Sequence, residues 1–248
     1  MTMYAAIWTA ISISLLAATS AIAADCRAVE FQEKRFTVCE ADPSTEDIRL
    51  VLDDSAGNKI ATFDRMNGIL ADEGREIAFA MNAGMYHADR RPVGLYVEAG
   101  RQAARLVTRD GPGNFGLLPN GVLCLNGETA QIIESRIFAS DPPDCRDATQ
   151  SGPMLVIDGE LHPRFLPKSS SRFIRNGVGV TEAGRLIAAI SDQPVNFHTF
   201  GRLFRDYLKT PNALFLDGNI SRLYSSNLGR HDIGFPLGPM LVVTRPVN

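Results

Sequence analysis

The sequence predicts an α+β fold: a single domain with a mixed β-sheet, several hairpins and a few helices. Short apolar runs alternate with turns that contain Gly or Asn along most of the 248 residues. One later segment instead has helical spacing, with apolar residues at Phe200, Leu203, Phe204, Tyr207 and Leu208. This segment stands between two apolar runs, so a strand, a helix and a second strand are expected there in order.

The first residues differ in character from the rest of the chain. Ala5 to Ala18 is almost entirely apolar, and the small residues at 21–24 precede Asp25. The pattern predicts a secretory signal peptide over residues 1–24, followed by the domain at 25–248. An uncleaved membrane anchor is the alternative, although a membrane span needs roughly 20 apolar residues. No later segment is long or apolar enough to span, so a periplasmic or secreted protein is expected.

Export would place the four cysteines in an oxidising compartment, where an even number predicts disulfides. Cys26 and Cys39 bracket a segment that alternates like a hairpin around Gln32–Lys34, which would bring them together and leave Cys124 to pair with Cys145. Four cysteines allow three pairings, and a zinc site is the alternative. Because no Cys-x-x-Cys motif or cluster of histidines accompanies them, we expect two structural disulfides, no metal and no cofactor.

The N-terminal half is expected to contain strands and turns. Residues Ile48 to Phe63 read as a strand pair with a turn at 56–58, and Ile77–Met81 reads as a buried strand. That strand ends on Asn82 and Gly84. Asn and Gly permit a positive φ and let backbone N–H groups approach a ligand, so both residues are candidates for substrate binding, with a plain turn as the alternative.

Three hairpins are expected further along the chain. Their turns lie at Ala99-Gly100, Asn120-Gly121 and Ala183-Gly184. Asn-Gly between apolar runs is a strong hairpin signal.

The strand–helix–strand unit follows the third of these turns. Its strands, Leu186–Ile190 and Ala213–Leu216, should be parallel in one sheet and joined by a right-handed crossover. Both would then end at the same edge, which places Asp192 beside Asp217. Polar residues beyond the carboxyl ends of strands are where open α/β sheets usually bind ligands.

Other polar residues are candidates for binding an anion. The expected helix begins near Asn196 and His198, and a helix N-terminus suits a phosphate, although a cap or packing role is the alternative for His198. Ser151 before Gly152 and Pro153 would donate to a phosphate or would cap a strand. Arg175 suits bidentate phosphate binding, against the alternative of a solvated surface arginine.

Composition and motifs exclude several classes of protein. The formal net charge is −3 and the Lys and Arg residues are scattered, so nucleic acid is not an expected partner. The sequence contains no phosphate-binding Gly-x-x-x-x-Gly-Lys-Ser/Thr loop, no Gly-x-Gly-x-x-Gly after a strand and no His-Glu-x-x-His.

An ordered set of motifs resembles the phosphodiester glycosidase family over roughly residues 77–243. The motifs are Asn82-Ala83-Gly84-Met85-Tyr86, Gly94, Ser151-Gly152-Pro153, Arg175-Asn176-Gly177-Val178-Gly179, and Leu216-Asp217-Gly218 with Ser221. Two motifs depart from the family's pattern. The family's Asn-Gly-Gly is here 82–84, Asn-Ala-Gly, and its Asp-Gly-Gly-Gly-Ser is here 217–221, Asp-Gly-Asn-Ile-Ser.

The resemblance implies a hydrolase that cleaves the bond between a sugar's anomeric carbon and a phosphate in an envelope or exported glycan. It implies Asp217 as acid/base or nucleophile, Asp192 as a second carboxylate and Arg175 as the phosphate ligand. The substrate would be bound by the remaining polar and glycine positions: Asn82, Gly84, Ser151, Gly152, Asn176, Asn196, His198, Gly218 and Ser221.

Two alternatives to this hydrolase remain. The altered glycine motifs favour a non-catalytic glycan-binding or exopolysaccharide-assembly protein on the same fold. A phosphodiesterase acting on nucleic acid is the narrower alternative, and the slightly acidic chain argues against it.

Overall fold

The computed structural model describes residues 24–247, which form three β-sheets and a few short helices. The predicted signal peptide lies outside these residues, except for Ala24. Every neighbouring pair of strands in the described part is antiparallel, so the expected mixed sheet is wrong in this respect. The α+β class holds in its coarse form, with strands far outnumbering helices.

The largest sheet has seven strands in the order β1-β2-β13-β12-β14-β10-β11. β12 lies between β13 and β14 and is antiparallel to both, so these two strands run parallel to each other without pairing. Asn176 is opposite both Ile190 and Asp217, which confirms that β13 and β14 end at the same edge. The strands of this sheet are β1 (Asp25–Phe31), β2 (Lys34–Ala41), β10 (Met154–Ile157), β11 (Glu160–Leu161), β12 (Asn176–Val180), β13 (Leu186–Ser191) and β14 (Asn212–Asp217).

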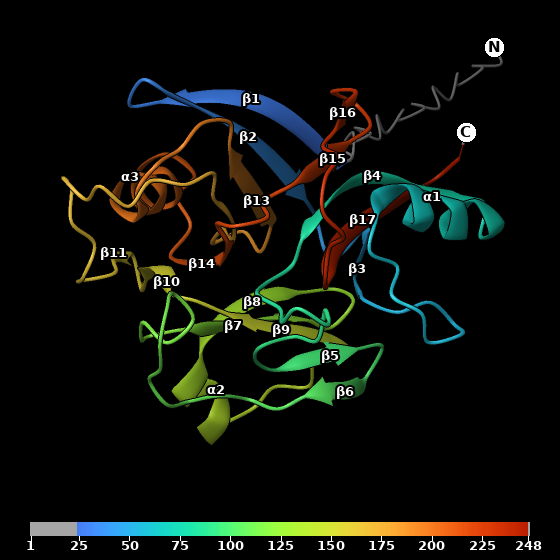
Figure 1. Ribbon diagram of the computed structural model, residues 1–248, viewed down its shortest axis with the longest axis horizontal. Helices are drawn as coiled ribbons and strands as arrows, with labels where there is room; N and C mark the ends of the chain where they lie inside the picture. Colours follow the sequence, from blue (N-terminus) through green and yellow to red (C-terminus); the bar gives the residue numbers. More distant parts are fainter. Residues whose placement is uncertain (1–23, 248) are drawn as a thin grey trace, which may run out of the picture.

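Two five-stranded sheets complete the fold, in the orders β16-β15-β4-β17-β3 and β6-β5-β9-β7-β8. Figure 1 shows the three sheets around a common centre, with the sheet of β5 to β9 below the other two. The second sheet comprises β3 (Asp47–Val51), β4 (Arg75–Asn82), β15 (Leu223–Ser225), β16 (Arg230–His231) and β17 (Met240–Pro246). The third comprises β5 (Tyr96–Glu98), β6 (Arg101–Ala104), β7 (Gly121–Leu125), β8 (Ala130–Glu134) and β9 (Asp147–Ser151).

One apolar core is built from all three sheets. Ala188 of the first sheet, Phe79 of the second and Leu123 of the third belong to the same buried cluster. The continuous apolar runs that predicted buried strands therefore do face protein on both sides, as in β7, where every residue is buried. Burial of each large apolar side chain contributes about 1.5–3 kcal/mol.

Both predicted disulfides are present. Cys26 and Cys39 are directly opposite each other in the β1–β2 hairpin, and their sulfurs are bonded. Cys124 of β7 is bonded to Cys145, just before β9. The first bridge joins adjacent strands, and the second fixes the Pro-rich loop to the third sheet.

The helices are α1 (Phe63–Asp72), α2 (Ser135–Ser140) and α3 (Phe197–Arg202), which continues into the π-helix η1 (Leu203–Tyr207). The predicted strand pair over 48–63 is present in short form: β3 leads to an antiparallel bridge between Asp53 and Lys59 across the turn, and only the last residue, Phe63, belongs to α1. Thr62 caps that helix by accepting a hydrogen bond from the backbone N–H of Arg65 at 3.2 Å. Among the described residues, no helix has the length and apolar character to cross a membrane.

The hairpin expected at Asn120-Gly121 is also wrong. Asn120 is fully buried, and its side-chain amide donates to the carbonyl of Phe115 at 3.1 Å. Gly121 begins β7, where an added Cβ would lie 3.2 Å from the carbonyl oxygen of Ile133. Close packing therefore explains why Asn and Gly stand at these two positions. The chain reverses instead between β7 and β8.

Candidate active site

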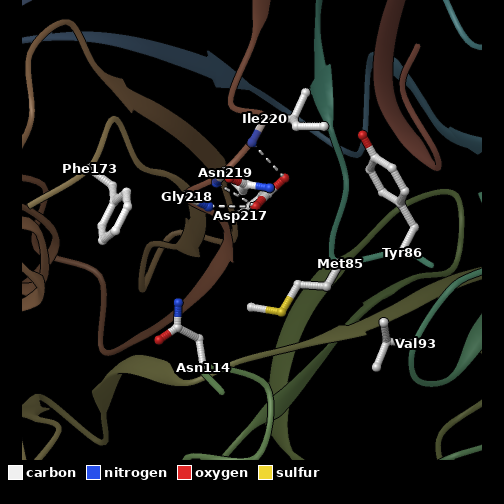
Figure 2. A pocket seen from close by; sticks show the side chains of 9 residues that line it. All are labelled: Met85, Tyr86, Val93, Asn114, Phe173, Asp217, Gly218, Asn219 and Ile220. Atoms are coloured by element: carbon white, nitrogen blue, oxygen red, sulfur yellow. Dashed lines mark hydrogen bonds between the residues drawn. The ribbon is translucent and has the colours of Figure 1, made fainter. Parts of the chain in front are cut away.

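Asp217 is the last residue of β14, and its carboxylate is clamped by the backbone of the turn that follows. Oδ1 accepts from the N–H groups of Gly218 at 2.6 Å and Asn219 at 2.8 Å, and Oδ2 accepts from that of Ile220 at 3.2 Å (Figure 2). Burial raises the pKa of the Asp217 carboxyl, against the opposite effect of these N–H groups. The result is an oriented carboxylate that gains a proton more readily than an ordinary aspartate.

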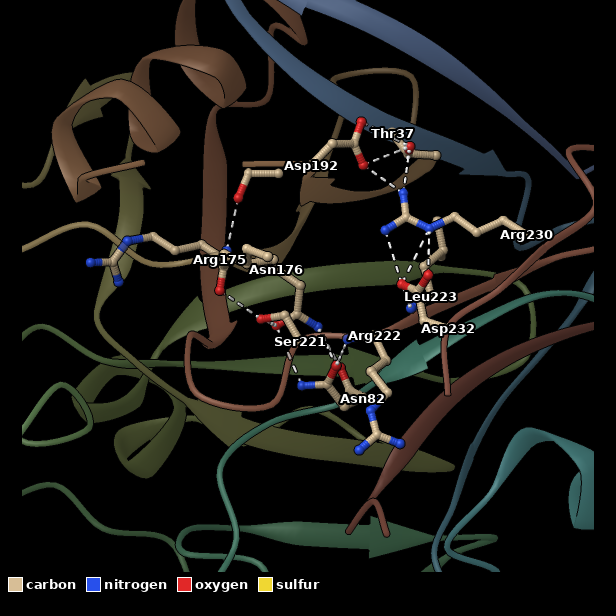
Figure 3. Close-up of polar contacts among 12 residues, drawn as sticks. Thr37, Asn82, Arg175, Asn176, Asp192, Ser221, Arg222, Leu223, Arg230 and Asp232 are labelled. Carbon is tan, nitrogen blue, oxygen red and sulfur yellow. Dashed lines mark hydrogen bonds and ion pairs between the residues drawn. The ribbon is translucent and has the colours of Figure 1, made fainter. Parts of the chain in front are cut away.

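Asn82 and Asn176 connect this carboxylate to two sheets. The side-chain amide of Asn82, at the end of β4, lies 3.4 Å from Oδ2 of Asp217. Asn176, at the start of β12, donates to Oδ1 of Asn82 at 3.0 Å and to its carbonyl at 2.9 Å. The backbone N–H of Arg222 also donates to Oδ1 of Asn82, at 3.0 Å (Figure 3). Both asparagines are fully buried, so they hold the Asp217 carboxylate in position from the protein interior.

Two of the predicted serines support the same turn. The Ser221 hydroxyl donates to the carbonyl of Ile174 at 3.0 Å, and the Ser151 hydroxyl donates to that of Leu216 at 3.0 Å. Ser151 is fully buried. Both side chains therefore brace the backbone on either side of Asp217.

The predicted glycines are required by conformation or by crowding. Gly84 has a φ of +127°, which disfavours any side chain. A Cβ on Gly152 would lie 2.5 Å from that of Asn120, and one on Gly218 would lie 3.1 Å from the ring of Phe215. These positions let the backbone pass close to the site without obstructing it.

The Asp217 carboxylate lines a pocket of about 410 Å³, here called the Asp217 pocket. Tyr86 also lines it, although the sequence predicts no role for this residue. Burial raises the pKa of the Tyr86 phenol, and the negative charge of Asp217 adds to this effect. Figure 2 shows the carboxylate and the phenol on one side of Met85. The lining residues are Met85, Tyr86, Val93, Asn114, Phe173, Asp217, Gly218, Asn219 and Ile220.

A second pocket, of about 840 Å³, shares the wall formed by Phe173 and residues 218–220; we call it the arginine pocket. Three arginines line it, of which Arg230 is neutralised by Asp192 at 2.6 Å and Asp232 at 2.9 Å (Figure 3). Asp192 thus lies at the same sheet edge as Asp217, as predicted, but it faces the arginine pocket and is held in an ion pair.

Arg222 has a different environment. Its side chain is only 8% exposed, and within residues 24–247 its guanidinium has no hydrogen-bond or ion-pair partner. Burial lowers its pKa. Its nitrogens line the arginine pocket and are not sealed from solvent, so a bound anion could form charge-assisted hydrogen bonds with them. An isolated arginine has no sequence pattern, so the sequence alone does not predict a role for Arg222.

Arg175 is fully buried behind the pocket wall. It donates from Nε to the carbonyl of Val195 at 2.9 Å, and its guanidinium stacks 3.7 Å from the ring centre of Phe197. Burial lowers the pKa of Arg175 to about 10. Nη1 has no partner in the described part of the chain and lies next to Gly218, which lines both pockets.

The structure does not bring Asn196 or His198 to either pocket. Asn196 caps α3 by accepting from the N–H of Thr199 at 2.9 Å, and its amide donates to the carbonyl of Pro167 at 3.0 Å. His198 lies on α3 near Arg202, and burial lowers its pKa. Residues 24–247 contain no group of three or more His, Cys, Asp or Glu side chains placed to hold a metal ion.

The fold and the site together define a class of protein in which three antiparallel sheets meet at a clamped carboxylate next to buried guanidinium groups. A family model described as phosphodiester glycosidase matches residues 75–244. The chain belongs to the phosphodiester glycosidase family, and the resemblance in its motifs is confirmed. It is also similar to YigE, an uncharacterised protein of Escherichia coli K12, with 32% identity over 204 residues that cover 82% of this chain and 80% of YigE.

Solved structures share the fold at low sequence identity. The catalytic domain of zebrafish N-acetylglucosamine-1-phosphodiester alpha-N-acetylglucosaminidase, auto-inhibited by its pro-peptide, matches with a TM-score of 0.60 at 13% identity, over 91% of this chain and 84% of that one. A putative exported protein of Burkholderia pseudomallei matches with a TM-score of 0.59 at 11% identity, over 85% and 74% of the two chains.

Proposed function

We propose that this protein hydrolyses glycosyl phosphodiesters in envelope or exported glycans. The observation that carries the proposal is the placement of the clamped Asp217 carboxylate in one pocket and the unpaired Arg222 guanidinium in the adjoining one. A sugar 1-phosphodiester needs both groups, because reaction at its anomeric carbon requires a carboxylate and its phosphate requires a cation. Membership of the phosphodiester glycosidase family supports the same reaction.

The proposed reaction adds water across the bond between the anomeric carbon and the phosphate oxygen. Asp217 acts as the nucleophile or as the base that takes the proton from water, through Oδ2, which has the longer contacts of the two oxygens. The electron pair of the broken bond leaves on the phosphate oxygen as a phosphate monoester. Since phosphate is already a good leaving group, strong general-acid help from a second carboxylate is less necessary.

The phosphate is proposed to contact Arg222 directly, since this guanidinium lines the arginine pocket. Arg175 is proposed to add positive charge near the phosphate. Its Nη1 lies next to Gly218 and has no hydrogen-bond partner in the described residues. Asp192 remains the candidate second carboxylate. It lies outside the Asp217 pocket and lines the arginine pocket, where it forms an ion pair with Arg230. Asn82 and Ser151 orient the substrate indirectly, by holding the turn that carries Asp217.

We infer that the protein is periplasmic or secreted. Two disulfides support this location, because such bonds persist in oxidising compartments. The similar structure described as a putative exported protein agrees with this location.

The test uses purified protein and a panel of sugar 1-(methyl phosphate) diesters that begins with N-acetylglucosamine, the sugar in the name of the zebrafish relative. Reaction in ¹⁸O-labelled water should place the label in the sugar and leave the phosphate unlabelled. Asp217→Asn should lower kcat/KM by about 10²–10⁴-fold. Asp72→Asn, on an exposed carboxylate at the end of α1, is the matched control. Equal turnover by Asp217→Asn and the unaltered protein would remove Asp217 from the mechanism.

A glycan-binding protein without catalysis is the second candidate. Asn219 and Ile220 occupy positions where the family's pattern has glycines, and both side chains line the two pockets. Binding of the diesters without any product over long incubation, for every sugar in the panel, would favour this function.

A further inference from the structure

The loop from Asp232 to Leu237 is anchored at both ends and presents apolar side chains to solvent. At one end, the N–H of Asp232 donates to the carbonyl of Leu223 at 3.1 Å, and at the other the N–H of Leu237 donates to that of Ala61 at 2.8 Å. Between these anchors, Ile233 is 83% exposed and Phe235 is 75% exposed. A fixed loop that exposes two large apolar side chains indicates a surface that is covered in function.

Both side chains line the arginine pocket, and a distant segment adds to them there. Phe173 and Ile174, just before β12, line the same pocket and are 49% and 42% exposed. Four apolar side chains from two segments therefore gather at one pocket, which distinguishes them from singly exposed residues elsewhere. Solitary exposed apolar residues need no explanation, whereas clustered ones mark binding sites.

The apolar loop and the Arg222 guanidinium are in direct contact. Gly234, between Ile233 and Phe235, packs against the guanidinium of Arg222, so that an added Cβ would lie 2.9 Å from Nη2. The same loop continues to Pro236, whose carbonyl accepts a hydrogen bond from the Tyr86 hydroxyl at 3.3 Å. An unpaired cation with an apolar surface directly beside it complements an anion that carries an apolar chain.

We propose that the arginine pocket binds a phosphodiester whose aglycone is a long apolar alcohol, so that the substrate is a lipid-linked sugar phosphate. The proposal rests on the proposed function for the placement of the sugar in the Asp217 pocket and of the phosphate at Arg222. The aglycone then extends over Ile233 and Phe235. A sugar or another polar aglycone would leave these side chains uncovered and would give no reason for their exposure beside a cation.

Binding of the aglycone-side fragment tests the inference without any need for turnover. Isothermal titration with octyl phosphate and methyl phosphate, below the micellar concentration, should show that octyl phosphate binds at least about tenfold more tightly. The double variant Ile233→Ser/Phe235→Ser should lose this preference and keep its affinity for methyl phosphate. Ile137→Ser, on a 59% exposed residue of α2, is the matched control and should keep the preference. Arg222→Gln should weaken both ligands.

Several outcomes would overturn the inference: equal affinities for the two phosphates, a preference that survives in the double variant, or octanol binding as tightly as octyl phosphate. Thermal unfolding of each variant verifies that it is folded. Failure of the proposed function is a separate result, because it is read from hydrolysis of the methyl diesters. Turnover of those diesters with no preference for octyl phosphate would reject the lipid aglycone and leave the hydrolase intact.

Discussion

The side-chain amide of Asn176 donates to Oδ1 of Asn82 at 3.0 Å, and this contact joins the seven-stranded sheet to the sheet of β4 directly behind the Asp217 carboxylate. Asn82 in turn lies 3.4 Å from Oδ2 of Asp217. The position of the proposed catalytic group therefore depends on a buried polar contact between residues 94 positions apart in the chain.

Asn176→Leu tests this dependence. The substitution removes the amide that the carbonyl and Oδ1 of Asn82 now share. Oδ1 keeps the N–H of Arg222, whereas loss of a hydrogen bond to the buried carbonyl costs about 1–3 kcal/mol. We expect the free energy of unfolding in urea to fall by that amount and kcat/KM to fall with it. Gln102→Leu, at an exposed amide, is the control. Unchanged stability and activity in Asn176→Leu would show that the contact does not hold the site.

Gly234→Ala tests the contact between the apolar loop and Arg222. Its φ of +150° and the 2.9 Å approach to Nη2 mean that a methyl group must displace the guanidinium. We expect the affinity for inorganic phosphate, measured by calorimetry, to fall about tenfold. Gly229→Ala also places a methyl group at a positive φ, here the less strained +62°, with no atom within 4 Å, and should bind phosphate normally. Equal loss in both variants would assign the effect to strain in the backbone.

The activity should have an acid limb set by Asp217. Burial raises the pKa of this carboxyl above the ordinary 3.8, so the reactive ionised form is lost as the pH falls through that higher value. The midpoint of the acid limb in kcat/KM should therefore lie above pH 3.8. The same shift makes the native state bind this proton more tightly than the unfolded state does. Protonation of Asp217 therefore stabilises the native state at pH values below the ordinary pKa. This contribution is lost as the pH rises through the raised pKa of the native state. A limb at or below 3.8 would contradict the assignment.

Removal of the disulfides should lower stability more than activity. The bridges join cysteines 13 and 21 residues apart, and closing loops of these sizes constrains the unfolded chain by about 3 kcal/mol each. No cysteine lines either pocket, so Cys124→Ala/Cys145→Ala should have a lower melting temperature and near-normal turnover at low temperature. Peptide mapping of the purified protein without reduction verifies both pairs. Loss of turnover in a variant that is still folded would give the bridge a role in the site.

The sequence by itself determined the features that depend on local pattern. Alternation around Gln32–Lys34 predicted the first hairpin and its disulfide, and the apolar run before Asp217 predicted the strand that carries the carboxylate. The order of the motifs predicted the family. These predictions are confirmed because strand periodicity and turn chemistry depend on only a few neighbouring residues. At Asn120-Gly121 the local signal for a hairpin was strong and wrong, because packing against distant strands decided the conformation.

Only the tertiary structure decided which charges are free. Arg230 and Asp192 are 38 residues apart and neutralise each other, whereas Arg222, equally ordinary in the sequence, has no such partner within residues 24–247. The exposure of Ile233 and Phe235 is likewise invisible in a chain where most apolar residues are buried. The physical reason is that pairing and burial are properties of surroundings, and the three sheets assemble those surroundings from segments that the sequence keeps far apart.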